Sequence, residues 1–186
     1  MRVGDVLVLI TSGILAIGKA LLLLFVLIIL GFYVPIFIDD WNARKIVIEL
    51  NKMPIISEKN VMLMNPDNDL WQGKAGYIEK KLDELIVIAR DMEILRKGTV
   101  PVRVGVSEFW RVQGIAYDPS SIVLDSKTLK KENFIVDGLL VHEFAHLLIE
   151  DSKDLDAHGA SWQKTCKSLL TKTFGEQPNA PYNMCH

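Results

Sequence analysis

The sequence of 186 residues has little cysteine and no excess of basic side chains. Its two cysteines, Cys166 and Cys185, are too few for a disulfide scaffold and do not form a CxxC pair. Residues 39–186 carry 19 basic against 22 acidic side chains, within a net charge of −2 for the whole sequence. This balance gives no bulk attraction to nucleic acid, which is therefore not expected as a partner on charge grounds.

A second absence is local, because no charged side chain occurs between Ala20 and Ile38. As a helix this run would span about 28 Å, close to the hydrocarbon core of a bilayer. A buried core helix is rarely apolar on every face over such a length. The residues after the run also lack the small-x-small pattern of a signal-peptide cleavage site. We therefore predict a retained single-pass membrane anchor in residues 1–38 that contacts lipid through residues 20–38.

The residues on either side of the apolar run indicate where the membrane span ends and how it is oriented. Tyr33 and Trp41 are the type of aromatic residue that lies at membrane interfaces. An upstream apolar stretch, Val6–Gly18, fits a helical extension, an interfacial helix or half of a hairpin. Basic residues before and after the run nearly balance, so the positive-inside rule gives only a slight preference for an N-terminus inside the cytoplasm. That preference places residues 39–186 outside the cytoplasm.

The rest of the sequence shows the two periodicities of a mixed α+β domain. Apolar residues at three- and four-residue spacing predict helices, over residues 77–95 (ended by Gly98), 131–149 and 160–173. Period-two alternation and turn residues predict strands, over residues 100–106, 113–117 and 122–124. The predicted order is helix, small sheet, helix, loop, helix.

These elements suggest three parts. Residues 1–38 form the anchor, residues 39–76 a juxtamembrane and lead-in segment, and residues 77–186 the folded domain. The strand at 122–124 is expected to border a cleft, where it is either an ordinary sheet strand or a partner for an extended substrate.

The second predicted helix contains the pattern HExxH, formed by His142, Glu143 and His146. Histidines four residues apart lie on one helix face, so both imidazoles can bind one metal ion. The glutamate between them lies beside the metal and can take a proton from a water molecule. Burying these polar groups in an apolar helix without a partner would be costly, which favours a metal site over two core histidines.

A catalytic zinc site of this type needs a third protein ligand. The metzincin continuation of the motif is absent, Glu150 is too close on the same helix, and Glu176 lies in the tail. His158 is the better candidate, because Gly159 follows it at a helix start and Trp162 can pack one turn on.

Other polar residues have weaker assignments. The acidic residues Asp151, Asp154 and Asp156 fit a solvated loop, one of them a possible acceptor for a histidine N–H. Tyr117 and Tyr182 are candidate oxyanion donors, although a tyrosine more often packs with its hydroxyl at the surface. Cys166 is expected to be a small buried apolar residue.

The stretch GIAYDPSSIVLDSKTLKKENFIVDGLLVHEFAHLLIEDSKDLDAHGASW resembles the catalytic core of the SprT-like zinc metallopeptidases. That family has a glycine-containing strand, an I-x-L strand, a helix with HExxH, an Asp-rich loop and an HGxxF/W helix start, and residues 77–173 follow this order. The resemblance implies a mini-gluzincin-like zincin fold. It also implies one zinc ion held by His142, His146 and His158, with Glu143 as catalytic base.

The resemblance further implies hydrolysis of peptide bonds in a protein or peptide substrate by a metal-activated water. Spartan-type relatives act on DNA-bound proteins, but this chain has neither a basic tail nor a zinc ribbon. Two alternatives remain, namely a zinc amidase acting on cell-wall peptides and a non-catalytic, membrane-tethered zinc-binding or interaction module. The intact Glu143 argues against the non-catalytic module, because a structural zinc site has no use for a base.

Overall fold

The computed structural model describes residues 3–56, 58–117, 119–149, 158–175 and 182–185. The chain divides into two compact units, Met1–Ile38 and Asp39–His186. Residues 39–76, expected above to be a lead-in segment, therefore fold together with residues 77–186.

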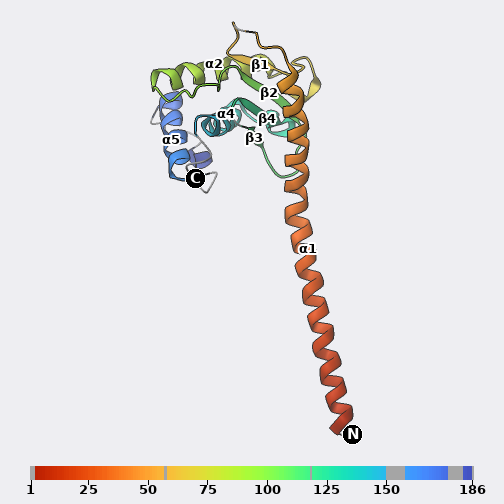
Figure 1. Ribbon diagram of the computed structural model, residues 1–186. Coiled ribbons are helices and arrows are strands. Elements are labelled where there is room, and N and C mark those ends of the chain that lie inside the picture. The colour runs from red at the N-terminus through yellow and green to blue at the C-terminus, as the bar shows by residue number, and fades with distance from the viewer. Residues whose placement is uncertain (1–2, 57, 118, 150–157, 176–181, 186) are drawn as a thin grey trace. The chain divides into compact units, whose positions relative to one another are not determined.

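The first unit is helical throughout its described residues. It is the N-terminal part of helix α1 (Val3–Lys52), which runs through Pro35 without a break (Figure 1). The upstream stretch 6–18 thus extends the same helix and is not half of a hairpin. Apolar side chains from Leu21 to Leu30 are exposed, and the helix is long and apolar enough to cross a membrane.

The second unit contains a four-stranded mixed sheet in the order β1-β2-β4-β3. Its strands are β1 (Val61–Leu63), β2 (Val102–Ser107), β3 (Gly114–Tyr117) and β4 (Ser121–Asp125). β1, β2 and β4 are parallel, with Val104 opposite Ile122, whereas β3 runs antiparallel to β4. The short strand β1 was not predicted. β3 lies at an edge of this sheet, and β4 is paired on both sides.

The described residues of this unit also form four further α-helices: α2 (Ala75–Asp91), α3 (Ser126–Leu129), α4 (Asn133–Leu147) and α5 (Ala160–Phe174). Two 3-10 turns, η1 (Asp69–Trp71) and η2 (Tyr182–Cys185), lie before α2 and after α5. The α+β class is confirmed, with a small mixed sheet. Helix α2 ends earlier than predicted, because Met92 caps it and Glu93 turns into the left-handed region at φ 57°.

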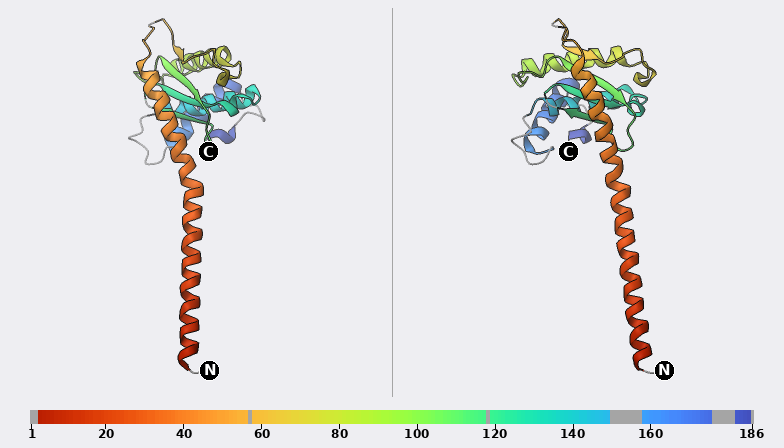
Figure 2. Two further views of the ribbon diagram at one scale, coloured as in Figure 1. Left: turned by 90° about the vertical axis from the view of Figure 1, so that its right-hand side faces the viewer. Right: turned by 45° about the vertical axis from the view of Figure 1, so that its right-hand side comes forward.

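The sheet has a different core on each face. Val102, Val104 and Val106 of β2 join the larger core, which also contains residues of α2, α4 and α5. The other face packs against the C-terminal part of α1 (Figure 2). Ala43 and Leu50 of α1 form a smaller core there with Phe109 and Val123. Gly105 permits this close approach, since a Cβ there would clash with the side chain of Ile46.

Candidate metal centre

Helix α4 supplies the HExxH residues to the larger core. Most of its other residues are apolar and buried, so the helix lies deep in this core. His142 and His146, one turn apart, then lie with their ring centroids 5.1 Å from each other. Glu143 is only 4% exposed.

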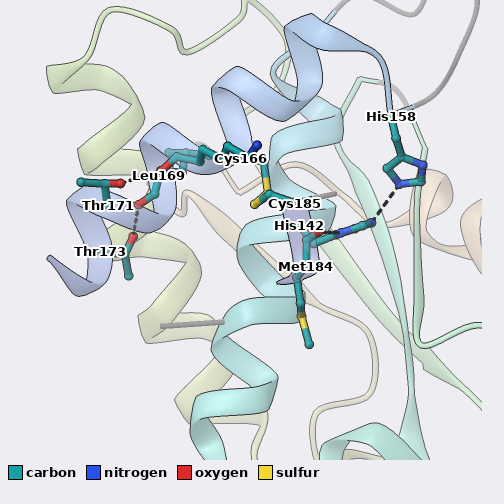
Figure 3. The surroundings of a disulfide bond; sticks show 9 residues. His142, His158, Cys166, Leu169, Thr171, Thr173, Met184 and Cys185 are labelled. Atoms are coloured by element: carbon teal, nitrogen blue, oxygen red, sulfur yellow. Dashed lines mark hydrogen bonds between the residues drawn. A yellow bond between two sulfur atoms is a disulfide. The ribbon is translucent and has the colours of Figure 1, made fainter. Parts of the chain in front are cut away.

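His158 approaches the same point from just before helix α5. Its Nε2 atom lies 3.3 Å from Nε2 of His142 (Figure 3). One ring nitrogen from each of His142, His146 and His158 lies within 4.8 Å of the others. This spacing brings the three histidines close enough to bind one metal ion.

Trp162 on the first turn of α5 packs against all three imidazoles. Its ring centroid lies 4.7 Å from that of His142, 5.0 Å from His146 and 4.5 Å from His158. The ring stacks on His146 with an interplanar angle of 24°. Because Trp162 is buried, it restricts the rotation of the imidazoles and excludes water from one side of the cluster.

The C-terminal turn η2 orients one of the imidazoles. Nδ1 of His142 lies 2.5 Å from the carbonyl oxygen of Met184. With Nδ1 donating to this carbonyl, the Nε2 lone pair is free for a metal. The sequence pattern around HExxH gave no sign of this contact, which links residues 42 positions apart.

A disulfide holds the same turn in place. Cys185, next to Met184, is bonded to Cys166 of α5, and both residues are fully buried (Figure 3). The prediction that Cys166 is simply a small apolar residue is therefore wrong. Pairing of two cysteines 19 residues apart depends on how α5 and η2 pack, which spacing alone does not reveal.

Burial shifts the pKa values of the cluster. It lowers the pKa of His142, and it lowers that of His146 to about 3, with the neighbouring histidines adding to the effect on His146. Both rings are therefore neutral at pH 7, which is the form that binds metals. Burial raises the pKa of Glu143 to about 8, partly opposed by a hydrogen bond from the Ala116 backbone.

Strand β3 lies directly against the Glu143 carboxyl group. A Cβ on Gly114 would come within 2.9 Å of Oε1 of Glu143, so a larger residue there would displace this side chain. The cluster opens into a cavity of about 380 Å³. Its lining residues come from the β2–β3 loop, from β3, from α4, from the residue before Gly159 and from η2. They are Val112, Gln113, Gly114, Leu139, His142, Glu143, His158 and Met184.

Two further sequence-based assignments are settled by the structure. The strand at residues 122–124, which the sequence left open between an ordinary sheet strand and a substrate partner, is β4, an ordinary sheet strand with β2 and β3 paired on its two sides. The hydroxyl of Tyr117 donates to the Asp40 carboxylate at 2.8 Å on the other face of the sheet, so it is not an oxyanion donor.

Other assignments fall outside what the structure describes. They concern Glu150, Asp151, Asp154, Asp156 and Glu176, and also the side chain of Tyr182.

Comparisons of the chain with protein-family models, with curated proteins and with solved structures give no match.

Proposed function

We propose that this protein is a membrane-anchored zinc metallopeptidase that hydrolyses peptide bonds, with Glu143 as general base. The observation that carries the proposal is the convergence of three imidazole nitrogens within 4.8 Å, in a cavity that Glu143 also lines. A structural zinc site would call for a fourth protein ligand, whereas a catalytic site leaves that position open.

The donor set fits zinc. Three neutral imidazoles are a common ligand set for catalytic zinc, and His142, His146 and His158 would hold the ion. The Met184 carbonyl fixes the tautomer of His142, as outer partners of zinc-binding histidines do. When bound, zinc supplies Lewis-acid chemistry that lowers the pKa of a water molecule and polarises a carbonyl group.

Glu143 is suited to move the proton. Its carboxyl group is buried beside the two α4 histidines, and its pKa near 8 lies close to neutrality. Beside a bound cation the ionised form of this group would be favoured, and the carboxylate could then accept a proton from water and release it to the leaving amine. The Ala116 hydrogen bond and the absence of a side chain at Gly114 hold this carboxyl group against β3.

The substrate would lie along β3. Among the described residues this strand pairs with β4 alone, and its Gly114 backbone lines the cavity. An extended peptide could add to the free edge by backbone hydrogen bonds, which would bring its carbonyl groups to Glu143 and the histidines. In this proposal β3 pairs with the substrate, a part that the sequence had left open for the strand at 122–124.

The domain is proposed to face an oxidising compartment. Disulfides such as Cys166–Cys185 form and persist outside the reducing cytoplasm. This agrees with the preference of the flanking charges for an exported domain. The apolar run 20–38 would then anchor the enzyme in the membrane.

The test uses the full chain in detergent micelles, with zinc and a fluorogenic casein substrate. We expect Glu143→Gln to lower turnover by a factor of about 10²–10⁴, the usual contribution of a general base. Zinc content should stay unchanged. Gly114→Ala is the second variant, because it displaces the Glu143 carboxyl without removing it, and it should also lower turnover while zinc stays bound.

Each other outcome would contradict the proposal in its own way. Full activity of Glu143→Gln would mean that another group is the base. Bound zinc with no cleavage of casein or of any other peptide would favour a non-catalytic zinc module. Cleavage confined to cell-wall peptides would favour the amidase alternative.

A further inference from the structure

The loop between β2 and β3 is bonded to the first residue after the apolar run. The Asp39 carboxylate is fully buried and accepts three backbone N–H groups, from Trp110 at 2.8 Å, Arg111 at 2.7 Å and Val112 at 3.2 Å. These charge-assisted bonds offset the cost of burying the acid. Because Asp39 follows Ile38 directly, their Cα atoms are about 3.8 Å apart. The backbone of residues 110–112 is therefore bonded to the residue that directly follows the apolar run.

The same loop is also held at its other end. The Phe109 N–H donates to Oδ1 of Asp125 at 3.0 Å, and Nζ of Lys127 donates to the Phe109 carbonyl at 2.8 Å. The Phe109 ring is buried in the smaller core, whereas the next side chain, Trp110, is 69% exposed. A large apolar ring thus projects outward from a backbone that is fixed on both sides.

The neighbouring surface of α1 has the composition of a membrane interface. Trp41, two residues after Asp39, is 54% exposed. The Lys45 ammonium group lies 5.4 Å from the centre of the Trp41 ring. Tryptophan next to basic side chains is typical of the headgroup region, where an apolar ring and a polar edge are both accommodated.

We propose that the loop of residues 108–112 is a second membrane contact, in which Trp110 inserts into the headgroup region of the bilayer that the apolar run spans. This lipid contact rests on the proposed membrane anchor and does not depend on the proposed peptidase activity. Other exposed aromatic rings can be accidental, but Trp110 is fixed by the one carboxylate that directly follows the uncharged run.

The contact also narrows the substrate class. Val112 donates its N–H to Asp39 and at the same time lines the metal-centre cavity. Gly114, which also lines the cavity, comes four positions after Trp110, so their Cα atoms are at most about 14 Å apart. A cavity held this close to the bilayer would act on polypeptide segments next to the membrane surface, such as the juxtamembrane segment of another membrane protein. This step rests on the proposed peptidase function.

The lipid contact is tested on the full chain in phosphatidylcholine vesicles, with tryptophan fluorescence as the readout. The background variant Trp41→Phe removes the other exposed tryptophan, and Trp71 and Trp162 are buried, at 2% and 1% exposure. Acyl chains brominated at carbons 6 and 7 should quench emission in this background, and a further Trp110→Phe change should remove most of the quenching. Aqueous iodide should quench the Trp110 component weakly.

The opposite pattern, strong quenching by iodide and none by the brominated lipid, would overturn the lipid contact. Metal content of both variants shows that the fold is kept. This readout involves no catalysis, so an inactive protein would leave its result valid.

The substrate class is tested with one casein segment fused to a single-span protein in the same vesicles. The segment is placed either directly after the span or beyond a rigid helical spacer of about 40 Å, roughly 27 residues. Faster cleavage of the near segment by at least tenfold is expected. Equal rates would overturn the substrate inference, whereas no cleavage of either fusion or of soluble casein would instead refute the proposed peptidase function.

Discussion

The metal centre has two walls that are built in different ways. The first wall is helix α4, where five consecutive residues place two imidazoles and a carboxyl group through the helical period alone. The second wall consists of His158, Trp162 and the turn η2, which meet only when α5 and the C-terminal segment pack together. A disulfide joins these two segments.

One wall of the site is therefore set by local helix geometry, and the other is set by tertiary packing. The first wall depends on a long buried helix, so it persists as long as the larger core is folded. The second wall depends on a turn of four residues, η2, which is too short to stay ordered by itself. Metal affinity should therefore be more easily changed at the second wall without loss of the fold.

The largest expected effect comes from removing one ligand on each wall. His146→Ala and His158→Ala should each weaken zinc binding by more than about 100-fold. Loss of a group that only hydrogen-bonds a ligand costs about 10–100-fold, and loss of the ligand itself should cost more. Zinc content by mass spectrometry and competition with a chelator measure the change. Lys167→Ala, on the exposed side of α5, is the matched control and should bind zinc normally. Unchanged affinity of His158→Ala would mean that the second wall supplies no ligand.

A smaller effect is expected from opening the second wall alone. Cys166→Ser combined with Cys185→Ser frees η2, so the Met184 carbonyl no longer orients His142. We expect zinc affinity to fall by about 10–100-fold, the usual effect of losing an outer partner of a ligand. Helix content from circular dichroism should stay the same, because α4 and α5 are otherwise packed in the larger core.

Reduction provides the control for this variant. A phosphine reductant should weaken zinc binding of the natural sequence by a similar factor and have no further effect on the double serine variant. If both proteins keep full affinity, η2 stays docked without the disulfide, and the two walls do not differ in the way that we infer.

The same contrast explains what sequence analysis could predict. HExxH is visible because i and i+4 residues share a helix face whatever the rest of the fold, and His158 was found from the glycine and tryptophan near it. Met184 acts through its backbone carbonyl, which every residue has, so its side chain carries no signal. The disulfide depends on the Cα–Cα separation of 5.7 Å that only packing of α5 and η2 creates.

The sheet shows a similar limit. Period-two alternation and turn residues located β2, β3 and β4, but strand order is a property of pairing, so the sequence left open whether β4 is an ordinary strand or a partner for substrate. Strand β1 has three residues, too few for a periodicity to be recognised. Helix α1 extends past the apolar run because Asp39, Ala43 and Leu50 form a buried face whose partner, the sheet, is not adjacent in sequence.

The smallest expected effect concerns Glu143 of the first wall. It is a change in how the stability of the metal-free protein depends on pH. Glu143 has a pKa near 8 in the folded chain against an ordinary value of 4.5, so the folded state holds a proton that the unfolded state releases between these values. Its contribution to stability is therefore lost as pH rises from about 4.5 to about 8. Glu143→Gln cannot titrate and should become progressively more stable than the natural sequence over this range.

The histidines act in the opposite direction but cancel in this comparison. Their lowered pKa values mean that the unfolded chain binds more protons below about pH 6.5, so stability falls with acidification in both proteins. Thermal unfolding in detergent after chelation measures the difference between the two midpoints at pH 5 and pH 8. The midpoint of Glu143→Gln minus that of the natural sequence should be larger at pH 8 than at pH 5 by about 3 °C or more. This is the shift that about 1 kcal/mol gives in a chain of this size. A constant difference would show that Glu143 is ionised in the folded, metal-free chain, and burial in the first wall would then not control its proton.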